Sequence, residues 1–175
     1  GMENWDIPYF EGMKSVQMPV VKTTGKNLID IKKFQTRMSA TITDVQENSI
    51  TFDAKEVWAG LIQDVTLKPN TQYTLSCNTS TNIVRSYVRH VLADSSLTQA
   101  YGGENTFSFT TKETGKISIT FENGDMENPI KTGLTVSNIQ LEEGSIATTY
   151  EPYKSSVFTI SETNLIIDSE KGRYY

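Results

Sequence analysis

Residues 116–122, Lys-Ile-Ser-Ile-Thr-Phe-Glu, alternate polar and apolar side chains without interruption. Ile117, Ile119 and Phe121 therefore fall on one side of an extended chain, and a period of two is typical of a strand with one buried face. The turn residues Thr114-Gly115 come directly before this segment. The same alternation recurs upstream in Tyr73, Leu75 and Cys77, in Val84 and Val88, and in Phe107 and Phe109.

Short segments with this period make up most of the chain. Beginning with an expected hairpin of Thr41–Val45 and Ser49–Asp53, about eight such segments follow one another with turn residues between them. No strands alternate with helices, which excludes a parallel nucleotide-binding sheet. A helical spacing occurs at Ile31, Phe34 and Met38 and predicts two or three turns at most. The sequence thus predicts an all-β protein, an antiparallel jelly-roll-like β-sandwich with at most one short helix.

Length, charge and cysteine content exclude several kinds of protein and of binding site. The 175 residues are enough for one domain with a sizeable core. The 16 Lys and Arg stand against 21 Asp and Glu, and the net charge of −5 argues against nucleic acid as the main partner. No run approaches the roughly 20 apolar residues that span a bilayer, so we expect no membrane insertion. Cys77 is the single cysteine, which excludes an intrachain disulfide and a thiolate zinc cluster.

Residues suited to catalysis are scarce. His90, the single histidine, shares the parity of Val84 and Val88, which predicts a structural residue on the core face. Neither G-x-S-x-G nor a phosphate-binding G-x-x-x-x-G-K-[ST] segment occurs. Two acidic groups occur, whose spacing selects no catalytic pair: Glu122, Asp125 and Glu127, and Glu142 with Glu143. We therefore expect no enzyme and no cofactor; a structural calcium ion stays open, although no calcium-loop motif locates one.

The opposite face of the segment around His90 carries a different set of side chains. If Val84 and Val88 are buried, then Arg85, Tyr87 and Arg89 point outward together. Such a row offers an aromatic surface between planar hydrogen-bond donors, which suits a sugar. The candidate carbohydrate-binding residues are this row together with two further aromatic side chains, Trp58 and Tyr101. The alternative is that the arginines and the tyrosine only cover the sheet or pair with nearby acids.

Three stretches carry a resemblance to a known family. They are residues 25–30, Gly-Lys-Asn-Leu-Ile-Asp; residues 67–76, Leu-Lys-Pro-Asn-Thr-Gln-Tyr-Thr-Leu-Ser; and residues 139–153, Ile-Gln-Leu-Glu-Glu-Gly-Ser-Ile-Ala-Thr-Thr-Tyr-Glu-Pro-Tyr. In this order they resemble the opening, middle and ending of sandwich modules in bacteriophage and prophage tail, baseplate and minor structural proteins. Those modules are similar to jelly-roll carbohydrate-binding modules. Their ligand residues vary, so the resemblance assigns no site residue to this chain.

The resemblance implies a domain organisation. The sandwich is expected over residues 25–153. Residues 1–24 are expected to form an extended lead-in, in which Gly1 ahead of Met2 is interpreted as the remnant of an affinity tag. Residues 154–175 are expected to be a C-terminal extension or the start of a next module.

The resemblance also implies a function and a location. It predicts a non-catalytic module of a tail protein that is made in the bacterial cytoplasm and carried on the virion, or otherwise an extracellular or cell-surface protein. The expected partners are a host-surface glycan, neighbouring tail-protein domains and further copies of the chain in a homo-oligomer. Two alternatives stay open: a structural spacer without a small ligand, and a glycan-acting hydrolase.

Overall fold

A computed structural model describes residues 20–159, 167–168 and 173–174 of the chain. Residues Thr24–Lys154 form one compact unit, and the two flanks form another. Within the described residues the regular structure is almost entirely β, and the helical part is one 3-10 turn, η1 (Ile31–Lys33). The part of the chain that the structure describes includes no helix long and apolar enough to cross a membrane.

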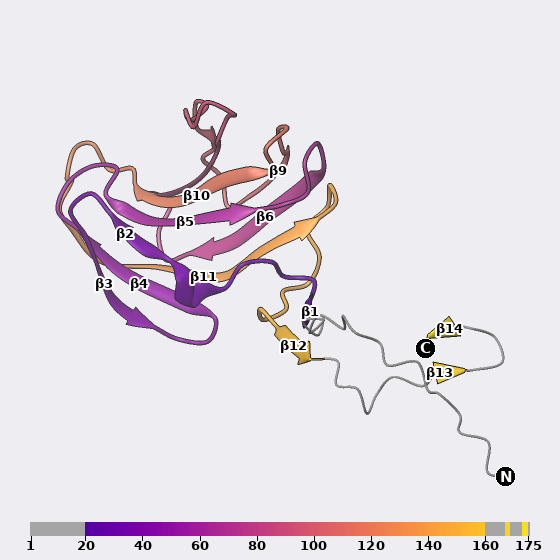
Figure 1. Cartoon of the computed structure of the whole chain (residues 1–175). Coiled ribbons are helices and arrows are strands. Elements are labelled where there is room, and N and C mark those ends of the chain that lie inside the picture. Colours follow the sequence, from indigo (N-terminus) through magenta and orange to yellow (C-terminus); the bar gives the residue numbers. More distant parts are fainter. Residues whose placement is uncertain (1–19, 160–166, 169–172, 175) are drawn as a thin grey trace, which may run out of the picture. The chain divides into compact units, whose positions relative to one another are not determined.

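The compact unit is a sandwich of two five-stranded sheets (Figure 1). Sheet I has the order β2 (Gln35–Arg37), β5 (Gly60–Thr66), β10 (Lys116–Asn123), β7 (Val84–His90) and β8 (Tyr101–Gly102). Sheet II has the order β3 (Ala40–Val45), β4 (Ser49–Ala54), β11 (Lys131–Glu143), β6 (Gln72–Thr79) and β9 (Thr106–Thr110). Paired neighbours are antiparallel, and the chain passes repeatedly from one sheet to the other, which confirms the predicted all-β sandwich.

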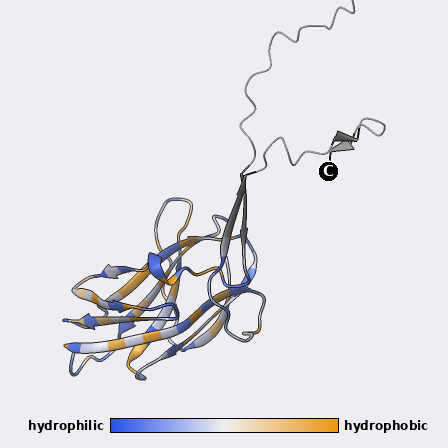
Figure 2. Cartoon of the chain, turned by 90° about the horizontal axis from the view of Figure 1, so that it is seen from below, coloured by the Kyte–Doolittle hydropathy of each residue, from blue (hydrophilic) through white to orange (hydrophobic). Residues whose placement is uncertain are grey.

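The core lies between the sheets and consists of every second side chain of the strands. Ile117, Ile119 and Phe121 of β10 are fully buried, as their alternation predicts. Figure 2 shows hydrophobic and hydrophilic segments alternating along the strands. Other large buried side chains come from both sheets: Phe52, Leu61, Tyr73, Leu75 and Leu141. Burial of each such side chain stabilises the fold by about 2 kcal/mol before the entropy cost is counted.

The helix suggested by Ile31, Phe34 and Met38 does not form. The Asp30 side chain accepts from the Lys32 amide (3.1 Å) and starts only a single 3-10 turn, after which Phe34 is extended. The Phe34 ring is buried against Phe121, with 5.4 Å between ring centroids. Packing on the core therefore outweighs the helical spacing and continues the chain as β2.

Residues of the opening and closing motifs bind each other. Asn27 is buried; its Nδ2 donates to the carbonyls of Ile139 (2.9 Å) and Glu151 (3.0 Å), and its Oδ1 accepts from the amides of Ile29 (3.0 Å) and Leu141 (3.2 Å). We call this set of contacts the Asn27 network. It joins the beginning of the sandwich to its end.

The flanks are only partly described. Strands β1 (Val20–Thr24) and β12 (Ser155–Thr159) form a two-stranded sheet, and β13 (Ile167–Asp168) pairs with β14 (Arg173–Tyr174). The rest of the predicted lead-in and C-terminal extension lies outside the described residues.

Candidate functional site

The outward face of sheet I has a pocket beside its central strand, β10. Ser118, Thr120 and Glu122 of β10 point away from the core, yet they are only 4%, 0% and 1% exposed. Strand β10 is thus buried on both faces. Arg89 of the neighbouring strand β7 covers two of them, Thr120 and Glu122. Glu122 also lines a pocket on this face and, being buried, forms its floor.

The strand register decides which side chains surround this floor. Thr120 lies opposite Ile62 of β5 and Tyr87 of β7, and Glu122 lies opposite Gly60 and Arg85. A Cβ at Gly60 would stand 1.9 Å from the Phe121 carbonyl oxygen, so this position accepts only glycine. The backbone of β10 occupies the place of a side chain here, so no side chain of β5 covers Glu122 at this position.

Glu122 is a buried carboxylate shared by two arginines. Its Oε1 lies 3.0 Å from Arg89 Nη1 and 3.2 Å from Arg37 Nη1. The same Nη1 of Arg89 donates to the Thr120 hydroxyl (3.0 Å), and that of Arg37 donates to the Trp58 carbonyl (2.8 Å). Because these contacts are partly shielded from water, they hold both guanidinium groups in fixed positions.

Small-ligand sites are clefts of roughly 300–1,000 Å³. The pocket above Glu122 measures about 420 Å³. We call it the arginine pocket. The Arg89 guanidinium lies 5.8 Å from the Tyr87 ring centroid, in a cation–π contact. The pocket is lined by Arg37, Met38, Trp58, Tyr87, Arg89, Gln99, Ala100 and Glu122.

The structure brings together three of the five residues predicted for ligand binding. Trp58, Tyr87 and Arg89 line the arginine pocket. Arg85 is exposed and lies next to Glu122 across the β7–β10 ladder, outside the pocket lining. Tyr101 is 54% exposed, pairs with the core residue Val88 and packs edge-on against Phe107, away from the pocket. A role in ligand binding stays a prediction for Trp58, Tyr87, Arg89 and Arg85, whereas Tyr101 is no part of the site proposed below.

Sequence reasoning missed five of the eight lining residues, among them the charged pair Arg37 and Glu122. The spacing of Glu122, Asp125 and Glu127 selects no functional acid, and Glu122 alone of the three belongs to β10. Its parity with Ser118 and Thr120 is a signal that could have placed it on the outward face. Arg37 lay in the expected helix, and nothing local indicated that it would reach Glu122.

The other chemically active side chains are buried in structural positions. His90 is 7% exposed on the core face, as predicted, and burial, with a smaller effect of Lys112, lowers its pKa. Burial raises the pKa of the Cys77 thiol to about 12, so it remains protonated. Among the described residues, no three His, Cys, Asp or Glu side chains lie close enough together to hold a metal ion.

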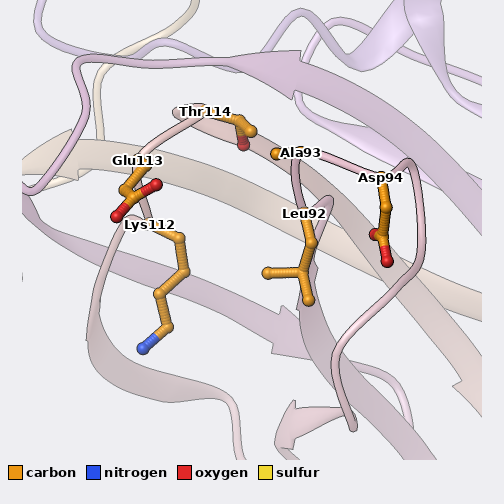
Figure 3. A pocket seen from close by; sticks show the side chains of 6 residues that line it. All are labelled: Leu92, Ala93, Asp94, Lys112, Glu113 and Thr114. Atoms are coloured by element: carbon orange, nitrogen blue, oxygen red, sulfur yellow. The ribbon is translucent and has the colours of Figure 1, made fainter.

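Two other hollows differ from the arginine pocket in chemistry. One of about 480 Å³ lies between two loops, and Figure 3 shows the Leu92 side chain between Lys112 and Asp94. No aromatic ring lines it. Tyr150 and Tyr153 line a separate hollow with Asn27, so these rings do not cover the arginine pocket.

Comparison with known proteins gives distant relatives. No family model matches the chain. It is 26% identical over 186 residues to the tRNA3(Ser)-specific nuclease WapA of Bacillus spizizenii and to the tRNA nuclease WapA of Bacillus subtilis strain 168. The match covers 93% of this chain, which spans about 8% of the length of these relatives. The expectation of a protein without enzymatic activity is therefore wrong, since the curated relatives are named as nucleases.

Two solved structures are distantly similar to the chain. The enzymatically active domain of tailspike protein 4 of bacteriophage CBA120 has a TM-score of 0.44 and 13% identity, over 65% of this chain and 20% of the tailspike chain. The glycosylation-associated Gap123 complex of Streptococcus agalactiae has a TM-score of 0.43 and 12% identity, over 80% of this chain and 48% of the other. The function proposed below depends on neither.

Proposed function

We propose that the chain is a carbohydrate-binding β-sandwich module of a longer protein and that the arginine pocket holds the sugar. The observation that carries this proposal is the meeting of Trp58 and Tyr87 with fixed charged groups around one hollow of about 420 Å³. The nuclease activity named for the relatives is proposed for the longer protein as a whole, with this segment supplying attachment to a surface.

The chemistry of the lining matches that of a saccharide. A sugar ring presents C–H groups that pack on aromatic rings, here Tyr87 and Trp58. Its hydroxyl groups both donate and accept hydrogen bonds. Glu122 can accept them and Arg89 can donate them, and both side chains are already held in place, which lowers the entropy cost of binding.

A surface location is part of the proposal. Shallow sugar sites of this kind bind weakly one at a time, so firm attachment to a cell or another glycan-coated surface needs several copies. We therefore propose that the module acts on a virion tail or at a cell surface, in an oligomer or a repeated array.

Glycan-array binding tests the proposal, with wild type compared with Tyr87→Ala and with Tyr101→Ala as the matched control. Tyr101 is as aromatic as Tyr87 but lies away from the pocket. We expect Tyr87→Ala to weaken binding about tenfold, the effect of losing one ring contact and its ordering of Arg89. We expect Tyr101→Ala to bind as wild type does.

A structural spacer is the second candidate, because Arg89 is tied to Glu122 and Thr120 within the sheet. If no glycan on the array binds the wild-type chain, the spacer replaces the proposal. If Tyr87→Ala binds as wild type while Tyr101→Ala does not, the sugar site lies elsewhere.

A further inference from the structure

The charges of the arginine pocket do not balance. We propose that the pocket selects acidic saccharides, whose carboxylate or phosphate group is bound by Arg37, Arg85 and Arg89; this inference rests on the carbohydrate-binding function proposed above. In the lining, two arginines stand against one acid, Glu122, which leaves one positive charge. The whole chain has a net charge of −5, so this is a local reversal of sign.

The two arginines of the lining keep unused donors. Within the described residues, each hydrogen bond and ion pair of Arg37 and Arg89 is made through Nη1. Both ion pairs also use the same oxygen, Oε1 of Glu122. The Nε and Nη2 groups of both guanidiniums therefore remain for a ligand, and their planar geometry suits a carboxylate or a phosphate.

Arg85 adds a third positive charge beside the pocket. It lies opposite Glu122 in the β7–β10 ladder, and its one polar contact in the described part of the chain is with the Gly103 carbonyl, at 3.5 Å. No described acid pairs with it. Gly103 also lies against the Tyr87 ring, so the Arg85 guanidinium is on the Tyr87 side of the pocket.

A further acid of sheet I is already engaged. Asp64 lies opposite Ser118 in the β5–β10 ladder and accepts a hydrogen bond from its hydroxyl. Two exposed acids flank the pocket: Glu56, which accepts from the Ser39 amide, and Glu104, next to Gly103. In the lining itself the two arginines still outnumber the one acid. An anion is attracted to such a site, and the attraction falls as salt is added.

A nucleic acid is the other polyanion to consider. An extended phosphate backbone would reach past the pocket. Beyond one or two contacts it would be repelled by the chain, whose net charge is −5, and by the acids on the same face. A sugar with a single anionic group contacts the arginine pocket alone and avoids this repulsion. The observations therefore favour the acidic saccharide.

Matched pairs of saccharides test the inference. The probes are galacturonate with its methyl ester, and glucose 6-phosphate with glucose, each measured at low and at high salt. We expect at least one acidic member to bind wild type about tenfold more tightly than its neutral partner at low salt, with a smaller preference at high salt. Comparison of the two pairs shows whether the pocket binds a carboxylate, a phosphate or both.

Arg85→Gln is the variant, and Lys68→Gln is the control with the same loss of charge on an exposed side chain that pairs with Glu143. We expect Arg85→Gln to reduce the preference for the acidic member at least threefold and Lys68→Gln to leave it unchanged. Equal binding of acidic and neutral members overturns this inference while the carbohydrate function stands. Binding of no saccharide overturns that function, and tighter binding of a tRNA than of any saccharide overturns the inference in favour of nucleic acid.

Discussion

His90 lies on the core face of β7, where its ring meets the edge of Phe109, with 5.9 Å between centroids. Its Nδ1 has no hydrogen-bond partner among the described residues. A proton on this ring would be a charge in a mostly apolar setting, so the folded state disfavours it. A single residue thus makes the stability of the fold sensitive to pH.

The sign of this effect follows from the lowered pKa of His90 in the folded state. Below about pH 6.5 the unfolded chain takes up the proton more readily than the folded chain, so stability falls as the pH falls through that value. We expect His90→Phe, which keeps a ring at this position, to lose less stability than wild type between pH 7.5 and pH 5. Urea unfolding at both pH values measures the difference; equal losses in the two proteins would contradict it.

At the scale of elements, the Asn27 network accounts for two of the three motifs that carried the family resemblance, the opening one and the closing one. The carboxylate of Glu142, three residues beyond Ile139 in β11, accepts from the amide (2.9 Å) and the hydroxyl (2.7 Å) of Thr148. Burial acts to raise the Glu142 pKa, but these hydrogen bonds outweigh it and lower the pKa. The motifs therefore stabilise the closure of the sandwich, and the arginine pocket lies on the other sheet.

Replacing the central residue of this network is expected to be costly. Asn27→Ala leaves buried backbone groups of Ile139 and Leu141 without their partner and is expected to destabilise the fold by about 3 kcal/mol. Asn48→Ala is the control, because Asn48 is exposed and, among the described residues, its side chain binds Asn138 alone. Its effect is expected to stay within about 0.5 kcal/mol. Urea midpoints measure both, and equal shifts would show that the network contributes little.

At the scale of the whole molecule, the core and the Asn27 network both lie within residues Thr24–Lys154. The Gly25 amide donates to the Lys154 carbonyl (2.9 Å), so this unit begins and ends at neighbouring positions. A unit of this kind contains the contacts that its folding needs.

The fragment of residues 24–154 is therefore expected to fold by itself. We expect one cooperative thermal transition within about 4 °C of that of the full chain, which corresponds to a change of about 1 kcal/mol. Circular dichroism during heating measures it for both proteins. A fragment without a cooperative transition would show that the flanks contribute to the stability of the sandwich.

The sequence by itself determined the local features. Its alternation correctly placed Ile117 and Phe121 in the core and buried Cys77 and His90, and it set Tyr87 and Arg89 on the opposite side from Val88. These features follow from the period of two, because neighbouring residues of a strand must point to opposite faces.

Only the tertiary structure decided which strands are neighbours, and so which residues share the pocket. Arg37, Trp58, Arg89 and Glu122 come from four distant parts of the chain. They meet because β2, β5, β10 and β7 lie in that order in one sheet, while Tyr101 of β8 falls on its other face. Strand order depends on how whole segments pack against the core, and no local pattern of side chains encodes it.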